Sequence, residues 1–154
     1  MESQKFSELG EREREQYNKG LERGGYEKIF NHCRYFYIRR RYSLIKEMMQ
    51  CAQGKKVLEI GSTAWRGWLD NNSILPSSLT CINISEAELQ AGVDSAASSD
   101  NSPDFILMDA HDLQFEDGTF DFVYGDAILH HLNMVPALDE IFRVLKPNGK
   151  ILFV

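Results

Sequence analysis

The sequence predicts an α/β fold in which helices cover both faces of a doubly wound parallel sheet, with further helices at the N-terminus. Two observations lead to this prediction. From residue 56 onward, short apolar runs typical of strands alternate with segments of helical periodicity. The first run, residues 57–60, ends at Gly61 and is rich in Val, Leu and Ile, as expected for a buried central strand. Strands joined through helices at this spacing imply right-handed crossovers and therefore parallel pairing.

The N-terminal segment, residues 1–54, is expected to be helical. One exposed helix is expected from Ser7 to Arg23, where a Gly-Gly pair ends it. Apolar residues recur at threes and fours over residues 26–52, which predicts a long amphipathic helix or a broken pair of helices. Gly54 is the expected C-terminal glycine of this segment.

The C-terminal segment, residues 55–154, is expected to contain five strands and three helices. Strands are predicted over residues 56–61, 78–84, 105–108, 120–124 and 150–154. Helices are predicted over residues 65–71, 85–93 and 134–145. Ser85 and Glu88 form a capping box for the second helix. Residues 94–100 are small and polar, which indicates a loop or a frayed helix end, and residues 147–149 (Pro-Asn-Gly) form a tight turn.

Length and composition limit the class of protein. The 154 residues are enough for one core, and their 43% hydrophobic and 26% charged content excludes disordered and fibrous chains. No stretch approaches the roughly 20 apolar residues of a membrane helix, and the charged N-terminus lacks the apolar segment of a secretory signal. We therefore expect a cytoplasmic protein. Cys33, Cys51 and Cys81 form no CxxC pair, and the histidines show no ligand spacing with them, so no metal ion is expected.

Charge is distributed unevenly along the chain. Residues 1–56 contain 13 Lys and Arg against 8 Asp and Glu, whereas residues 57–154 contain 4 against 15. The acidic C-terminal segment would repel a nucleic-acid backbone, so nucleic acid is not expected as a partner. Residues 34–42 (RYFYIRRRY) form a cluster of interleaved Arg and aromatic residues. They suit an anionic or aromatic ligand, or a nucleic acid, or they form a helix with one buried aromatic face and one solvated basic face.

Three linked stretches of the C-terminal segment carry a resemblance to a known family. They are FILMDAHDLQFEDGTFDFVY at residues 105–124, LHHL at residues 129–132 and IFRVLKPNGKIL at residues 141–152. In this order they resemble the class I S-adenosylmethionine-dependent methyltransferases of the small-molecule type. The resemblance implies a Rossmann-like sheet of strand order 3-2-1-4-5. It also implies S-adenosylmethionine as cofactor and methyl transfer to an O, N or C atom of a small molecule.

The resemblance further implies which residues bind the cofactor. Glu59, Gly61 and Ser62 match the first strand and turn, which usually approach the methionine part. Asn83 stands where the family usually has an acidic residue that binds the ribose hydroxyls, and Ile84 follows it. Three residues after the third strand match the segment that usually faces the adenine. These are Asp109, Ala110 and His111.

The methyl acceptor is implied to lie after the fourth strand. Gly125 is the last cofactor candidate there, Asp126 is a candidate catalytic residue, and His130 is a candidate general base. Independently of the family, ligands bind beyond the carboxyl ends of the strands of an open parallel sheet, where several of these residues stand. In related methyltransferases an N-terminal helical segment often covers the site as a lid. The family normally continues past the fifth strand, so we expect an incomplete C-terminal end and an exposed strand edge through which a homodimer could form.

Structural alternatives remain open for most of these residues. Glu59 can be a helix cap or a salt-bridge partner, Asp109 can cap local backbone, and Asn83 can form an Asx turn before Ser85. One ring of the His130 and His131 pair can be packed while the other bonds the backbone. Trp65 and Trp68 suit helix packing better than ligand stacking.

The turn after the first strand departs from the family, because a glycine-rich loop would place Gly near Thr63 and Trp65. The neutral Asn83 is a second departure. Both support an alternative function, a catalytically silent methyltransferase-like protein that binds a partner or a ligand for regulation.

Overall fold

The computed structural model describes residues 39–154. The chain divides into two units, Met1–Ser43 and Leu44–Val154, and the strands found among residues 39–154 all belong to the second unit. The helix predicted over residues 7–23 and the first half of the segment 26–52 lie outside the described residues. The predicted division of the chain at residues 54 and 55, into a helical N-terminal segment and a C-terminal segment that contains the sheet, therefore stays a prediction.

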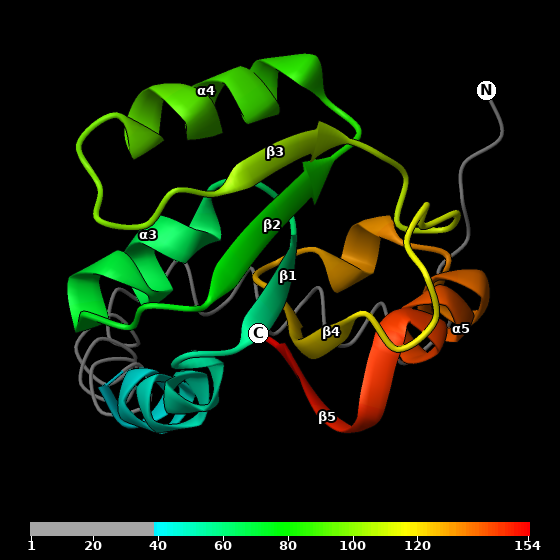
Figure 1. The fold of residues 1–154 in the computed structure, drawn as a ribbon, viewed down its shortest axis with the longest axis horizontal. Helices are drawn as coiled ribbons and strands as arrows, with labels where there is room; N and C mark the ends of the chain where they lie inside the picture. The colour runs from blue at the N-terminus through cyan, green and yellow to red at the C-terminus, as the bar shows by residue number, and fades with distance from the viewer. Residues whose placement is uncertain (1–38) are drawn as a thin grey trace, which may run out of the picture. The chain divides into compact units, whose positions relative to one another are not determined.

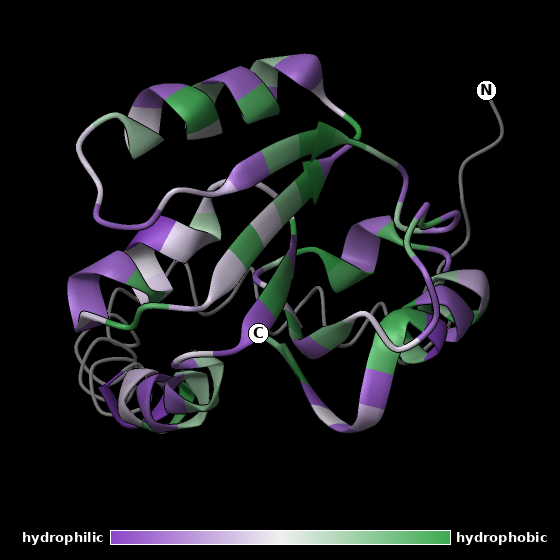
Figure 2. Cartoon of the chain, viewed as in Figure 1, coloured by the Kyte–Doolittle hydropathy of each residue, from purple (hydrophilic) through white to green (hydrophobic). Residues whose placement is uncertain are grey.

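A five-stranded, fully parallel sheet with strand order β3-β2-β1-β4-β5 forms the centre of the second unit, which confirms the predicted fold class (Figure 1). Its strands are β1 (Lys56–Ile60), β2 (Ser78–Asn83), β3 (Asp104–Leu107), β4 (Phe120–Gly125) and β5 (Leu145–Phe153). The first four agree with the sequence prediction to within one residue at each end. β1 and β2 are largely hydrophobic (Figure 2), and four of the five residues of β1 and four of the six residues of β2 are buried.

Helices precede β1 and connect most of the strands. They are a helix over residues 39–49, η1 (Gln50–Ala52), α3 (Ala64–Trp68), η2 (Asp70–Asn72), α4 (Glu86–Ala96), η3 (Leu129–His131) and α5 (Met134–Val144). The Ser85 Oγ accepts a hydrogen bond from the Glu88 N–H at 3.4 Å, as the capping box predicts. α4 continues three residues beyond its predicted end. The Arg66 guanidinium, from α3, donates to the Ser95 carbonyl and so satisfies a carbonyl in the last turn of α4.

Two apolar layers cover the two faces of the sheet. On one face residues 45–52 and α3 pack against side chains of β1, β2 and β4. This layer includes Met49, Trp65, Leu69, Val57, Cys81 and Tyr124. On the other face α5 packs against the alternate side chains of the same strands. That layer includes Ile141, Val144, Leu58, Ile82 and Val123. Burial on both faces is what makes the strands apolar without a period of two.

The strand β5 starts five residues earlier than predicted. Leu145 pairs with Phe120, whereas Lys150 pairs with Phe122, so five residues of β5 span a distance that two residues of β4 span. The extra residues of β5 include residues 147–149, the predicted turn, and Asn148 has a positive φ of 66°. The turn is thus a bulge between two paired stretches and does not precede the strand.

Candidate functional site

The carboxyl ends of the strands bring most of the predicted site residues to one edge of the sheet. Gly61 follows β1, Asn83 ends β2, Asp109 lies two residues beyond β3, and Gly125 ends β4. β1, β2, β3 and β4 are parallel neighbours, so these residues share an edge although up to 64 positions separate them in sequence. This is the edge at which open parallel sheets bind ligands.

Glu59 is completely buried and faces the core behind the turn. Its Oε1 accepts from the Ala64 N–H at 2.9 Å, and its Oε2 accepts from the Tyr124 hydroxyl at 2.6 Å and from the Cys81 thiol at 3.6 Å. Burial raises the pKa of Glu59 above its ordinary value, and the bonds from Tyr124 and Ala64 oppose that rise. The alternative role as a helix cap is therefore realised at Ala64. A contact between Glu59 and a cofactor stays a prediction, and from this position it would act through the turn.

The turn itself needs only one glycine. Gly61 has a φ of +116°, which side-chain-bearing residues rarely adopt, and its N–H donates to the Ile82 carbonyl at 2.9 Å. Thr63 has a φ of −131°, which any residue adopts. The Trp65 side chain is completely buried against Phe105, and its indole N–H donates to the Ser62 carbonyl at 3.2 Å. The Trp65 ring therefore lies in the core and leaves the exposed side of the turn open.

The Asn83 side chain has two partners within the protein. Its Oδ1 accepts from the Ser85 N–H at 3.0 Å, which is the Asx turn that the sequence allowed. Its Nδ2 donates to the Ser62 Oγ at 3.1 Å, which ties the end of β2 to the turn after β1. One amide hydrogen and one oxygen lone pair of Asn83 remain for a ligand. Ile84 follows with 75% of its surface exposed, an unusual exposure for a large apolar side chain.

Asp109 and His111 form a pair on the exposed loop after β3. The Asp109 Oδ1 accepts from the His111 N–H at 2.9 Å and lies 2.5 Å from the His111 Nδ1. These bonds lower the pKa of Asp109 below its ordinary value, the backbone bond most. The His111 Nε2 accepts from the Asn133 N–H at 2.9 Å. The ring therefore carries its proton on Nδ1 and bridges this loop to the residue before α5.

The segment after β4 contains the two catalytic candidates. Asp126 accepts a hydrogen bond from the Trp68 indole at 2.8 Å, so Trp68 both packs in the core and holds this carboxylate. Gly125 is closely packed, because a Cβ there would lie 2.6 Å from Ile128 and 3.0 Å from the Ile60 carbonyl. His130 and His131 are both exposed with ring centroids 3.8 Å apart. The alternative in which one of these rings is packed inside the protein is wrong, because η3 carries both on the surface.

Sequence reasoning missed the roles of Tyr124 and Trp68. The sequence pattern marks Tyr124 only as a residue of a buried strand, but a phenol in such a place needs a hydrogen-bond partner. Glu59 is the one carboxylate inside the neighbouring strand β1. A buried phenol beside a buried carboxylate is the signal that could have found the contact.

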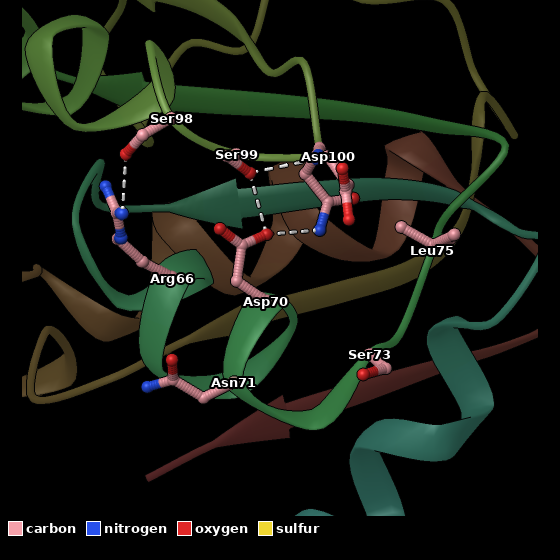
Figure 3. A pocket seen from close by; sticks show the side chains of 9 residues that line it. Arg66, Asp70, Asn71, Ser73, Leu75, Ser98, Ser99 and Asp100 are labelled. Carbon is pink, nitrogen blue, oxygen red and sulfur yellow. Dashed lines mark hydrogen bonds between the residues drawn. The ribbon is translucent and has the colours of Figure 1, made fainter.

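A polar cavity of about 330 Å³ lies elsewhere, before the amino ends of β2 and β3 (Figure 3). Arg66 bonds Ser98 there, and Asp70 accepts from Ser99 at 2.8 Å and from Asn101 at 2.7 Å. These groups are mutually satisfied, and the cavity is at the edge of the sheet opposite to the predicted site. We therefore place the candidate site at the carboxyl edge.

Residues 58–153 match the family model described as a methyltransferase domain. The chain belongs to this family. Demethylmenaquinone methyltransferase of Staphylococcus aureus is 33% identical over 106 residues, which are 67% of this chain and 44% of that protein. Glycine/sarcosine/dimethylglycine N-methyltransferase of Actinopolyspora halophila is 33% identical over 78 residues, which are 49% of this chain and 14% of that protein. The methyltransferase-family chain thus spans less than half of the length of these relatives.

Solved structures of the same fold include the PH0226 protein of Pyrococcus horikoshii, with a TM-score of 0.60 and 28% identity over 75% of this chain and 57% of that one. The [4+2]-cyclase SpnF has a TM-score of 0.63 and 25% identity over 74% of this chain and 43% of its own. In residues 39–154 no helix has the length and apolar character to cross a membrane, and no group of three or more His, Cys, Asp or Glu could hold a metal ion.

Proposed function

We propose that this chain binds S-adenosylmethionine at the carboxyl edge of its sheet and transfers the methyl group to an O, N or C atom of a small molecule. The observation that carries the proposal is the convergence of the ends of β1, β2, β3 and β4, with the methyltransferase-family match covering all of them. The residues present fit the cofactor. Asp109 offers an exposed carboxylate whose pKa is lowered, Ile84 offers an exposed apolar surface, and Asn83 keeps one donor and one acceptor.

The cofactor would supply a methyl group on a sulfonium that is already primed to leave, so positioning by the protein can provide most of the acceleration. In this arrangement Asp109 would accept from the adenine amino group, Ile84 would pack against the adenosine, and Asn83 would bind a ribose hydroxyl. The turn at Gly61 and Ser62 would hold the methionine part, and Ala110, His111 and Gly125 would line the remainder of the site. Asp126 and His130 are the groups that could take a proton from an acceptor that carries one.

We propose a small molecule as the acceptor and no narrower class. The two named relatives act on demethylmenaquinone and on glycine or its methylated derivatives, and these acceptors differ in size, polarity and reacting atom. We further propose a cytoplasmic location, a lid formed by residues 1–54 over the site of residues 55–154, and no nucleic-acid partner. A homodimer through the outer edge of β5 belongs to the same proposal, supported by the place of β5 at the end of the strand order.

A silent methyltransferase-like binding protein is the second candidate, favoured by Thr63, Trp65 and Asn83 in place of the usual residues. Calorimetry with S-adenosylmethionine and S-adenosylhomocysteine separates the two functions. The enzyme binds both ligands below millimolar concentration and methylates an acceptor; the absence of binding at millimolar ligand would contradict the proposal.

Asp109→Ala tests the adenine assignment. We expect this variant to weaken S-adenosylhomocysteine binding by about 1 to 3 kcal/mol, because it removes one hydrogen bond of the complex to a charged group. Asp112→Ala is the matched control on the same loop, because the side chain of Asp112 bonds only the neighbouring Gln114. Equal affinities of the two variants would refute the assignment.

A further inference from the structure

The turn after β1 is held by side chains where a methyltransferase-family loop usually has glycines. Residues 61–64 contain a single positive φ, at Gly61, and side-chain hydrogen bonds reach the turn from three directions. Two of these bonds depend on aromatic residues to which neither the family resemblance nor the proposed function gives a role. These residues are Trp65 and Tyr124.

Trp65 fixes the carbonyl of Ser62. Its indole N–H donates to that carbonyl at 3.2 Å, from a side chain that is completely buried. α4 closes over the same carbonyl, because a Cβ at Gly92 would lie only 2.6 Å from it. In a trans peptide the N–H points in the direction opposite to the C=O of the same peptide unit. The Ser62 carbonyl points into the protein, so the Thr63 N–H points outward, on the side from which a ligand can approach.

Tyr124 fixes the other end of the turn through Glu59. Its hydroxyl donates to the Glu59 Oε2 at 2.6 Å, and the Glu59 Oε1 accepts from the Ala64 N–H at 2.9 Å. Tyr124 is 1% exposed, so no water can replace its hydroxyl without a rearrangement of the core. Through Glu59 on β1, these two hydrogen bonds link β4 to the first residue of α3.

We propose that Trp65 and Tyr124 are positioning residues that fix the backbone of residues 61–64 for the methionine part of S-adenosylmethionine. This inference rests on the proposed function, since it assigns two further residues to the same cofactor site. Neither side chain touches the cofactor. Their hydrogen bonds hold the turn in one conformation, and a turn already in its bound shape loses less entropy when the ligand binds.

The test compares two ligands on two variants. Trp65→Phe removes the indole N–H, and Tyr124→Phe removes the hydroxyl. Calorimetry measures the affinity for S-adenosylhomocysteine, which has the amino-acid part, and for 5′-methylthioadenosine, which lacks it. We expect each variant to weaken S-adenosylhomocysteine binding about 2- to 10-fold, as for one hydrogen bond, and to leave 5′-methylthioadenosine binding within about 2-fold of wild type.

Ile141→Val is the control for stability, because Ile141 is completely buried on the opposite face of the sheet. This variant should lower the melting temperature without changing the ratio of the two affinities. Unchanged S-adenosylhomocysteine binding in Trp65→Phe and Tyr124→Phe, or equal weakening of both ligands, would overturn the inference and leave the proposed function standing. A wild-type protein that binds neither ligand contradicts the proposed function itself, and the inference with it.

Discussion

The two loops that bear most of the candidate cofactor residues are stabilised by opposite means. The turn after β1 is tied down from inside by Glu59, Trp65 and Tyr124, none of which is more than 1% exposed. The loop after β3 is tied down at the surface. There the Asp109 side chain is 57% exposed and the His111 side chain 28% exposed.

Arg143 extends the surface support of the second loop. It reaches from α5 to the carbonyls of Leu113 and Phe115, at 2.6 and 2.7 Å, while Glu140 accepts from the Leu113 N–H at 2.8 Å. A turn between two buried strands can thus be stabilised by side chains of the core. A longer connection with no helix of its own is stabilised instead by hydrogen bonds from charged side chains of a neighbouring helix. The two loops should therefore respond differently to mutation and to pH.

The largest effect is expected from Glu59→Ala. This change leaves the Ala64 N–H and the Tyr124 hydroxyl without their partner inside the core, which should lower the free energy of unfolding by about 2 to 4 kcal/mol. Asp109→Ala, the corresponding change in the exposed loop, should lower it by less than about 0.5 kcal/mol. Urea denaturation at pH 7 measures both. Similar values for the two variants would break the comparison.

A smaller effect is expected from Arg143→Met. The methionine keeps much of the apolar stem but leaves the Leu113 and Phe115 carbonyls to water, so we expect a lower midpoint of urea denaturation. Asp117→Asn is the matched control. It weakens only the salt bridge of Arg143 to Asp117, whose side chain is 81% exposed, and should cost almost nothing. If Asp117→Asn lowered the stability to urea as much as Arg143→Met does, the effect would come from surface charge and not from the bonds to the two carbonyls.

The smallest and most diagnostic effect concerns pH. Burial raises the pKa of Glu59 above 4.5, so the pH-dependent part of its contribution to the free energy of unfolding is present below pH 4.5 and is lost as the pH rises through the raised value. Hydrogen bonds from His111 lower the pKa of Asp109 below 3.8, so its contribution is present above pH 3.8 and is lost as the pH falls through the lowered value.

Glu59→Gln and Asp109→Asn should each remove one of these two slopes. Thermal unfolding of both variants and of wild type between about pH 3 and pH 7 checks the prediction, since this range brackets the ordinary carboxyl pKa values. A slope of the same sign at both sites would contradict it. The Asp109 slope should be the weaker one, since solvent screens that carboxylate.

The sequence predicted what depends on local patterns. Runs of buried residues and the Ser85 cap located the strands and α4 because burial and capping act over a few neighbouring residues. The linked motifs over residues 105–152 identified the methyltransferase family. The sequence could not predict that Trp65 would point inward or that Tyr124 would meet Glu59, since both contacts join segments whose distance is set by the sheet register. It also placed the start of β5 too late, because pairing with Phe120 is a property of the assembled sheet.

The bulge in β5 also limits how regularly another strand could pair with it. Among residues 39–154, β5 is an outer strand, and a long flat outer strand is a template for aggregation. Here Pro147 offers no N–H, and the excess residues break the strand, leaving residues 150–153 as the second paired stretch. This stretch is shorter than the roughly six or seven residues that a cross-β segment needs, and Lys146 and Lys150 place a charge on each side of the bulge. The irregularity that obscured β5 in the sequence thereby limits the length of regular ladder that another strand could form along β5.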